Sequence, residues 1–442
     1  MGRISKILTP FRIIILGFAG IILLGTILLM LPVSSSNGAF TPFSEALFTA
    51  TSATCVTGLV VHDTASYWSL FGRSVILIMI QIGGLGIVTV GASFFLLSGR
   101  RTTLVQRSTM QKAVSAQKAG GIVGLIKLII LITFIIELAG ALLLMPFFIT
   151  QYGAKGIGMA VFHSISAFCN AGFDVMGSST GEYSSFTSFT GNAGINTVVM
   201  LLIILGGIGF LTWNDIIKNK LRFKHYSLQS KIILLTSLVL IVVPALLFFF
   251  LDLKALPMGE RVLSSLFQSV TTRTAGFNTI DLNSMTSAGK SVMIVLMLIG
   301  GSPGSTAGGM KTTTIAVLLA NAHSCFFQQG DVHCFKRRID SDTVRTASTL
   351  LMMYTVLCFG SACVINISEG IPFGQCLFET ASAVGTVGLT LGITTKLGIL
   401  SRCVLIVLMF IGRVGGLTLI YAALKKDSNK NSKLPLATVT VG

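Results

Sequence analysis

Long apolar runs alternate with half-length apolar stretches along this chain. Two of the long runs cover residues 11–32 and 122–149, and each exceeds the roughly 20 helical residues that cross a bilayer core of about 30 Å. The half-length stretches are amphipathic and about ten residues long, so as helices they reach only about 15 Å. The pattern predicts an all-α polytopic membrane protein.

Four segments repeat one pattern, in which small hydroxyl or apolar residues precede a turn-forming glycine. The segments are 52–63, 166–176, 269–281 and 382–392, and their glycines are Gly58, Gly172, Gly276 and Gly388. Each segment follows a half-length stretch and precedes a second apolar run. The sequence therefore predicts four tandem repeats of span, pore half-helix, filter loop and span around a pseudo-fourfold pore, with eight spans in all.

The repeats divide the chain into predicted units. These are pore repeat 1 (1–98), pore repeat 2 (99–213) with a basic cytoplasmic linker at 99–120, pore repeat 3 (214–322) with an intramembrane gating loop at 300–312, pore repeat 4 (323–424) and a cytoplasmic C-terminal tail (425–442).

Composition excludes a soluble protein, and the placement of charge argues against nucleic acid as a partner. The chain is 52% hydrophobic and only 11% charged, whereas soluble domains carry about 25% charged residues. Its formal net charge is +17, but most Lys and Arg residues gather in short segments between apolar runs. Such segments face the cytoplasm under the positive-inside rule, so both termini are expected there and most acidic residues outside.

Backbone chemistry explains why glycine recurs in the four loops. Irregular backbone at membrane depth is tolerated where it is buried or lines a water-filled path, and carbonyl oxygens can replace the hydration shell of K⁺. Glycine also reaches positive φ, which lets carbonyls point inward, and a half-helix directs a negative C-terminal dipole at the pore. The predicted filter and K⁺-binding residues are Cys55, Val56, Thr57, Gly58, Cys169, Asn170, Ala171, Gly172, Arg273, Thr274, Ala275, Gly276, Gly385, Thr386, Val387 and Gly388.

A Gly- and Pro-rich segment interrupts the second apolar run of the third repeat, which predicts an intramembrane loop beneath the filter. The predicted gate comprises Gly300, Gly301, Ser302, Pro303, Gly304, Ser305, Thr306, Ala307, Gly308, Gly309, Lys311 and Arg413. A mid-membrane charge such as Arg413 is a functional hypothesis by default. Two alternatives stay open: Arg413 pairs with Glu137, and Lys311 anchors the loop at the cytoplasmic surface.

Other motifs suggest weaker hypotheses. The segment around Lys311 does not meet the G-x-x-x-x-G-K-[ST] pattern of a nucleotide-binding loop. Glycine pairs in 81–87 and 205–210 are expected to serve close helix packing. Arg273 is expected to point behind the filter, and His163 and Glu379 to act as hydrogen-bonding scaffolds. The eight cysteines predict no disulfide framework, and residues His323, Cys325, His333 and Cys334 fit no standard metal spacing.

From LTPFR (8–12) to GRVGGLT (412–418), the chain resembles the Ktr/Trk/HKT superfamily of potassium transporters, most like the bacterial Ktr-type ion-conducting subunit. The resemblance implies K⁺ uptake across a bacterial plasma membrane, one filter glycine per repeat and a gate formed by the loop 300–312 with Arg413. It also implies a homodimer on a separate RCK-type cytoplasmic ring that binds ATP or ADP, with Na⁺ as an activator and no cofactor in this chain. The basic segments 100–118 and 218–231 and the tail are candidate docking surfaces, or else contact anionic lipid.

Three alternatives differ in class. One is a Trk-type or Na⁺-coupled cation transporter of the same superfamily. The second is a secondary transporter of a larger solute, although such proteins usually consist of two inverted halves rather than four parallel units. The third is a membrane enzyme, which is disfavoured because no His, Asp, Glu or Cys residues share catalytic spacing.

Overall fold

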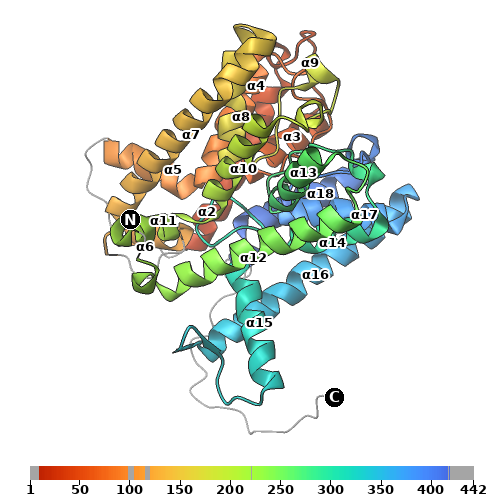
Figure 1. The fold of residues 1–442 in the computed structure, drawn as a ribbon. Coiled ribbons are helices and arrows are strands. Elements are labelled where there is room, and N and C mark those ends of the chain that lie inside the picture. The colour runs from red at the N-terminus through yellow and green to blue at the C-terminus, as the bar shows by residue number, and fades with distance from the viewer. Residues whose placement is uncertain (1–8, 98–103, 115–119, 221, 417, 419–442) are drawn as a thin grey trace.

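The computed structural model describes residues 9–97, 104–114, 120–220, 222–416 and 418. The described chain is mostly helical, as expected, with one short antiparallel hairpin of β1 (His333–Cys334) and β2 (Arg337–Arg338). Figure 1 shows the long helices arranged around the half-length helices α3, α8, α13 and α17, while α15 projects from the body.

The elements follow a recurring order of long helix, half-length helix, loop and second helix. The first two sets are α2 (Pro10–Met30), η1 (Pro32–Ser34), α3 (Phe43–Cys55), α4 (Leu70–Leu85), α5 (Ile87–Leu97), α6 (Leu104–Ala113), α7 (Ile122–Tyr152), α8 (Lys155–Phe168), α9 (Gly177–Thr180), η2 (Thr187–Phe189), α10 (Ala193–Gly207), α11 (Phe210–Asn219) and η3 (Phe223–His225). The last two are α12 (Leu228–Leu251), α13 (Met258–Thr271), η4 (Leu282–Ser284), α14 (Ser287–Leu298), α15 (Thr312–Phe326), α16 (Ser341–Glu369), α17 (Phe373–Gly385), η5 (Thr394–Lys396) and α18 (Ile399–Val414).

Within the described residues, fewer uninterrupted spans are found than the expected eight. By length and composition, four of the described helices (α2, α7, α12 and α16) can each cross a membrane, and the pairs α4–α5 and α10–α11 raise the total to six if each bent pair is one span. Helix α14 has 12 residues and α18 has 16, which at 1.5 Å per residue reach about 18 and 24 Å. The third repeat falls short because the Gly-rich segment after α14 breaks its second helix.

Glycines account for three sharp ends of the second helices. Helix α4 ends at Gly86 (φ 84°), α11 begins after Gly209 (φ 94°) and α18 ends at Gly415 (φ 87°). Residues with a Cβ rarely adopt these dihedrals. At the first two breaks the helix axis turns by 96°, so each second helix bends away from the body instead of continuing straight.

Hydrogen-bonding side chains mark where several helices begin. Ser69 accepts from the backbone of Gly72, Asn192 from Ile195 and Ser227 from Ser230. Each side chain satisfies one of the free N–H groups at a helix N-terminus, an arrangement that contributes about 1 kcal/mol. These caps fix the starts of α4, α10 and α12 beside the half-length helices.

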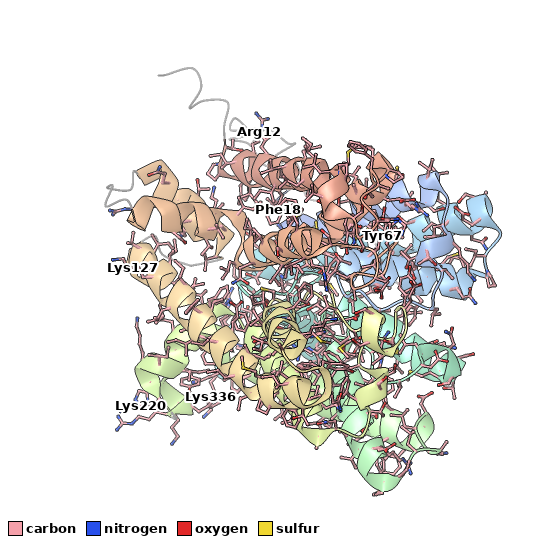
Figure 2. The ribbon with its side chains drawn as sticks, turned by 90° about the horizontal axis from the view of Figure 1, so that it is seen from above. Arg12, Phe18, Tyr67, Lys127, Lys220 and Lys336 are labelled. Carbon is pink, nitrogen blue, oxygen red and sulfur yellow. The ribbon has the colours of Figure 1, made fainter. Side chains whose placement is uncertain are left out.

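The outer faces of the long helices are apolar and exposed. Leu16, Leu23, Leu24 and Ile27 of α2 are all more than half exposed. A patch of this kind would aggregate in water, whereas lipid tails solvate it. In Figure 2 the labelled cations Arg12, Lys127, Lys220 and Lys336 lie toward one side of the molecule and Tyr67 toward the other.

The adjacent glycines Gly206 and Gly207 on α10 allow a direct test of the packing. A Cβ at Gly206 would collide with the carbonyl oxygen of Phe168 and lie 2.8 Å from Oγ1 of Thr306, whereas one at Gly207 would meet nothing within 4 Å. We expect Gly206→Ala to destabilise the protein by about 1–3 kcal/mol, the usual cost of overpacking. Thermal unfolding of the purified variants measures this. Gly207→Ala serves as the control, and equal melting temperatures for the two variants would contradict the packing described.

Candidate functional site: a ring of glycine turns

The four glycine turns meet in a closed ring. A Cβ built on Gly58 would lie 2.6 Å from the carbonyl oxygen of Ala171, and one built on Gly172 would lie 2.8 Å from that of Ala275. Gly276 faces the carbonyl oxygen of Val387 in the same way, and Gly388 faces that of Thr57, both at still closer approach. Each glycine thus touches the next turn, and the fourth touches the first. No residue larger than glycine fits these positions without displacing backbone.

The four turns share an unusual backbone conformation. The residue two positions before each glycine has a positive φ: 58° at Val56, 57° at Asn170, 76° at Thr274 and 52° at Thr386. The four glycines also have positive φ, between 67° and 94°. Positive φ is uncommon outside glycine and is strained for β-branched residues such as Val and Thr. Repetition of this strain at four matching positions points to a function for the backbone.

Hydroxyl groups brace each turn against its half-helix. Oγ of Ser52 accepts from the backbone N–H of Gly58 at 3.1 Å, and Oγ of Ser382 accepts from that of Gly388 at 3.1 Å. In the other two turns the hydroxyl donates instead, from Ser166 to the carbonyl of Phe173 and from Thr271 to that of Phe277, each at 2.7 Å. The sequence contained the signal, since a hydroxyl residue lies five or six positions before each glycine, but the site prediction left it out.

Side chains at the ring point in different directions. The hydroxyls of Thr57, Thr274 and Thr386 are buried and have no hydrogen-bond partner in the described chain. Arg273 points to α12, where its guanidinium donates to Oγ of Ser237 at 3.2 Å. This contact lies behind the turn, in agreement with the expectation for Arg273. Asn170 points toward the loop that follows α14 and donates from Nδ2 to Oγ1 of Thr306 at 2.9 Å.

Residues 299–311 join α14 to α15 and are called the interrupted segment below, because the helix is interrupted there. This segment lies directly against two of the turns. Oγ1 of Thr306 donates to the carbonyl of Phe168 at 2.9 Å, so this residue contacts the end of α8 as well as Asn170. Gly308 packs against the side chain of Thr386, and a Cβ at Gly309 would lie 2.9 Å from the carbonyl oxygen of Gly385. The segment therefore packs against the second and fourth turns.

The bend between α10 and α11 holds this segment in place. Because the helix breaks, the carbonyls of Gly206 and Gly207 lose their helical partners, and they accept from the backbone N–H groups of Thr306 and Ser302 at 3.2 and 3.0 Å. The N–H of Phe210, at the start of α11, donates to the carbonyl of Gly304 at 2.7 Å. These three bonds satisfy backbone groups on both sides of the contact and tie a loop with no regular structure to the bend.

Arg413 fastens the segment from the other side. It lies on α18 and donates to the carbonyl oxygens of Thr306, Gly83 and Gly84. The alternative in which Arg413 pairs with Glu137 is wrong, because Glu137 accepts from Nε2 of Gln81 at 3.1 Å. Carbonyl groups freed at the end of α4 supply the partners instead.

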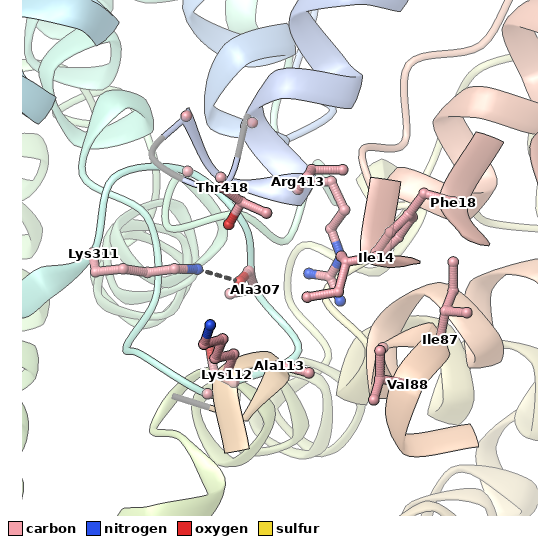
Figure 3. Close-up of a pocket in the computed structure, with 18 of the residues that line it drawn as sticks. Ile14, Phe18, Ile87, Val88, Lys112, Ala113, Ala307, Lys311, Arg413 and Thr418 are labelled. Atoms are coloured by element: carbon pink, nitrogen blue, oxygen red, sulfur yellow. Dashed lines mark hydrogen bonds between the residues drawn. The ribbon is translucent and has the colours of Figure 1, made fainter. Parts of the chain in front are cut away.

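Lys311 folds back onto the same segment. Its Nζ donates to the carbonyl oxygens of Ala307 and Gly308 at 2.8 and 3.3 Å. Lys311 therefore bonds within its own loop, and the alternative of an anchor at the cytoplasmic surface stays a prediction. Lys311 and Arg413 both line a cavity of about 290 Å³ beside the interrupted segment (Figure 3).

Comparison with known proteins identifies the family. The profile of the TrkH family, described as cation transport protein, matches residues 6–434. The chain belongs to this family. It is 38% identical to the potassium/sodium uptake protein NtpJ of Enterococcus hirae, over 100% of this chain and 99% of that protein. It is also 38% identical to the Ktr system potassium uptake protein B of Bacillus subtilis, over 98% of this chain and 97% of that protein.

A solved structure shares the fold of this TrkH-family chain. The potassium transporter TrkH from Vibrio parahaemolyticus superposes with a TM-score of 0.73 and 18% sequence identity, covering 94% of this chain and 84% of that one. The family is one of transporters, which disfavours the enzyme alternative. In the described ranges of the chain, no three His, Cys, Asp or Glu residues are placed to hold a metal ion.

Two polar residues on the half-helices support the turns, as expected. His163 contacts the carbonyl of its own helix at Met159 through Nδ1, and its Nε2 accepts from the backbone of Val175 at 3.3 Å. Glu379 accepts from the hydroxyl of Thr390 at 2.9 Å and from that of Thr394. Both side chains are fully buried and connect a half-helix to the chain that follows its turn.

The hydroxyl braces predict a measurable cost. Ser52→Ala removes the acceptor for the Gly58 N–H, and a buried unsatisfied donor costs about 1–3 kcal/mol. Ser382→Ala should lower stability by a similar amount, because the Ser382 hydroxyl makes the matching bond in the fourth turn and the variant loses it. Ser74→Ala is the control, since that exposed hydroxyl donates only to the carbonyl of Leu70 in its own helix. The measurement is the melting temperature of each variant. If Ser74→Ala lowers it as much as the other two variants do, the account of the braced turns is contradicted.

Proposed function

We propose that this protein takes up potassium across the bacterial plasma membrane as the ion-translocating subunit of a Ktr-type system. The closed ring of glycine turns carries the proposal, because it brings four sets of backbone carbonyls to one place inside a helical membrane protein. Such carbonyls can replace the water around K⁺. Relatives at 35–38% identity over nearly the whole chain are named potassium uptake proteins.

The proposed filter comprises the four stretches 55–58, 169–172, 273–276 and 385–388. Glycine fits because each ring position touches the neighbouring turn. The half-helices α3, α8, α13 and α17 end at these stretches, so the negative ends of their dipoles favour a cation over an anion there. The side chains within the stretches differ from one turn to the next, as a filter made from backbone allows.

The proposed gate is the segment 300–309 with Lys311 and Arg413. It lies against two turns of the ring and lacks regular structure, so it can move without unwinding a helix. Two positive charges beside a K⁺ path raise the energy of a cation there. Release of the hydrogen bonds from Arg413 to Thr306 and to the end of α4 would free the segment.

Orientation and partners follow from charge and from the family. We propose that the cationic side of Figure 2 faces the cytoplasm by the positive-inside rule, and that both termini, which carry Lys and Arg residues, lie on the same side. We extend the proposal to a homodimer on a cytoplasmic RCK-type ring that binds ATP or ADP, with Na⁺ as an activator. The tail at 425–442 and residues 100–103, 115–118 and 221 of the predicted docking surfaces lie outside the described residues.

A Na⁺-coupled cation transporter of the same family is the second candidate. It is favoured by one observation, the 38% identity to a relative named as a potassium/sodium uptake protein. Measuring ²²Na⁺ uptake together with K⁺ uptake into proteoliposomes separates the two. K⁺ uptake that carries no ²²Na⁺ with it supports the first candidate, in which Na⁺ only activates, and K⁺ uptake accompanied by ²²Na⁺ in a fixed ratio supports the second.

The filter proposal predicts a loss of selectivity in Gly58→Ser. A side chain here would push on the Ala171 carbonyl, so the carbonyl spacing that suits K⁺ is lost. We expect the preference for K⁺ over Na⁺ to fall about tenfold, equivalent to about 1.4 kcal/mol. Competition of Na⁺ with ⁸⁶Rb⁺ uptake measures it. Gly38→Ser is the control, because Gly38 also has a positive φ of 68° but has nothing within 4 Å of a Cβ.

The gate proposal predicts a higher rate of K⁺ flux through the Arg413→Ala variant. The change removes one positive charge and the hydrogen bonds that hold Thr306, so K⁺ flux should rise several-fold in proteoliposomes. Shortening 300–309 should act in the same direction. Arg402→Ala is the control for loss of an arginine from α18, since Arg402 contacts Glu45 and the carbonyl of Thr395. Unchanged or lower flux in well-folded Arg413→Ala would refute the gate.

A further inference from the structure

The cavity beside the proposed gate has a one-sided charge. It measures about 290 Å³ and is enclosed by α2, the α4–α5 bend, α6, α16, α18 and the interrupted segment. Three charged side chains line it: Lys112, Lys311 and Arg413. No carboxylate belongs to its described lining. In Figure 3, Lys112 approaches from α6 and Lys311 from the interrupted segment, with Arg413 beside them.

Within the part of the chain that the structure describes, these three cations have no counter-charge. Lys311 and Arg413 donate only to backbone carbonyls, and Lys112 lies 4.4 Å from the centre of the Phe11 ring. None of the three takes part in an ion pair within the described residues. Lys112 is exposed, and like charges gathered at one cavity repel one another. An anion between them would offset this repulsion.

Tyr354 adds a hydroxyl to the lining of the cavity. Its side chain is only 2% exposed and lines the cavity from α16. Its hydroxyl forms no hydrogen bond within the described chain and is not among the fully buried polar atoms, so it keeps some accessible surface and is free to donate to a ligand. The hydroxyl can donate to an anion held by the three cations.

Backbone geometry adds further positive potential. Gly86 and Ile87, at the start of the 11-residue helix α5, line the cavity, and so does Lys311, the residue before α15. Helix N-termini carry a partial positive charge that favours phosphate groups. Lys and Arg bind phosphate by charge-assisted hydrogen bonds. The cavity volume is close to the lower end for small-molecule pockets, about 300 Å³.

We propose that this cavity binds a phosphate-bearing anion between Lys112, Lys311, Arg413 and Tyr354, and that the bound anion lowers the barrier to K⁺ at the gate. Two sources offer the same chemistry: a free phosphate compound from the cytoplasm, or the headgroup of an anionic lipid. The binding step is independent of the proposed transport function, whereas the effect on K⁺ flux rests on it.

Binding is tested with the full chain in lipid nanodiscs. Inorganic phosphate and pyrophosphate are titrated by calorimetry in phosphatidylcholine nanodiscs, and then in nanodiscs containing phosphatidylglycerol. We expect Lys112→Gln to weaken pyrophosphate binding at least tenfold and Tyr354→Phe to weaken it several-fold. Lys218→Gln, which removes an exposed cation from α11, should leave it unchanged. Loss of pyrophosphate binding in phosphatidylglycerol nanodiscs would identify the lipid headgroup as the occupant.

Two results would overturn the binding site. One is equal affinity for pyrophosphate in Lys112→Gln, Tyr354→Phe and the unmodified chain. The other is no binding of either phosphate compound in phosphatidylcholine together with melting temperatures that do not respond to phosphatidylglycerol. Correct folding of each variant is checked by its melting temperature, so a misfolded variant is not counted.

Measurements of K⁺ flux test the second part of the proposal, that the bound anion lowers the barrier at the gate. Phosphate compound on the cytoplasmic face, or phosphatidylglycerol in the bilayer, should raise K⁺ flux several-fold in the unmodified chain and not in Lys112→Gln. If the ligand binds but the rate of K⁺ flux does not change, the gating role is refuted. If no K⁺ flux occurs under any condition while pyrophosphate still binds, the transport function fails and the anion site stands.

Discussion

The structure depends on one constraint, the close contact of four backbone turns inside an apolar protein. Each ring glycine touches a carbonyl of the next turn, so there is no space for any side chain at these four positions. Unpaired backbone groups at this depth are costly unless they are buried against protein or face a water-filled path. The hydroxyl braces of Ser52, Ser166, Thr271 and Ser382 and the buried half-helices hold this arrangement together.

The breaks in the second helices have a common consequence. A helix that ends at glycine leaves its last carbonyl groups without the usual partners four residues on. Those at Gly83 and Gly84 accept from Arg413, and those at Gly206 and Gly207 accept from the interrupted segment. The same bends that shorten the spans therefore create the attachment points for the segment below the ring. Glycines that would weaken an ordinary helix here position the proposed gate.

The repeat pattern made much of the fold predictable. Four glycines at matched positions and a Pro- and Gly-rich interruption of one apolar run were visible directly in the sequence, and so was the direction of Arg273, because a cation is repelled from a cation path. The bends at Gly86 and Gly209 were not foreseen, since a glycine pair in an apolar run also suits close packing of a straight helix.

Long-range partners could not be read from the sequence. Arg413 was open to pairing with Glu137 because a buried carboxylate is the obvious partner for an arginine, but backbone carbonyls freed by a distant helix break took that place. Lys311 likewise turned toward its own loop. The cavity that joins Lys112, Arg413 and Tyr354 draws on α6, α16 and α18, and no spacing along the chain indicates that these helices meet.

Anomalous diffraction or high-resolution density from protein prepared with Tl⁺ or Rb⁺ tests the central claim most directly. The account predicts ion density within the ring, surrounded by carbonyl oxygens from all four turns at Gly58, Gly172, Gly276 and Gly388. Density bound to side chains elsewhere, with none inside the ring under conditions that support transport, would contradict it.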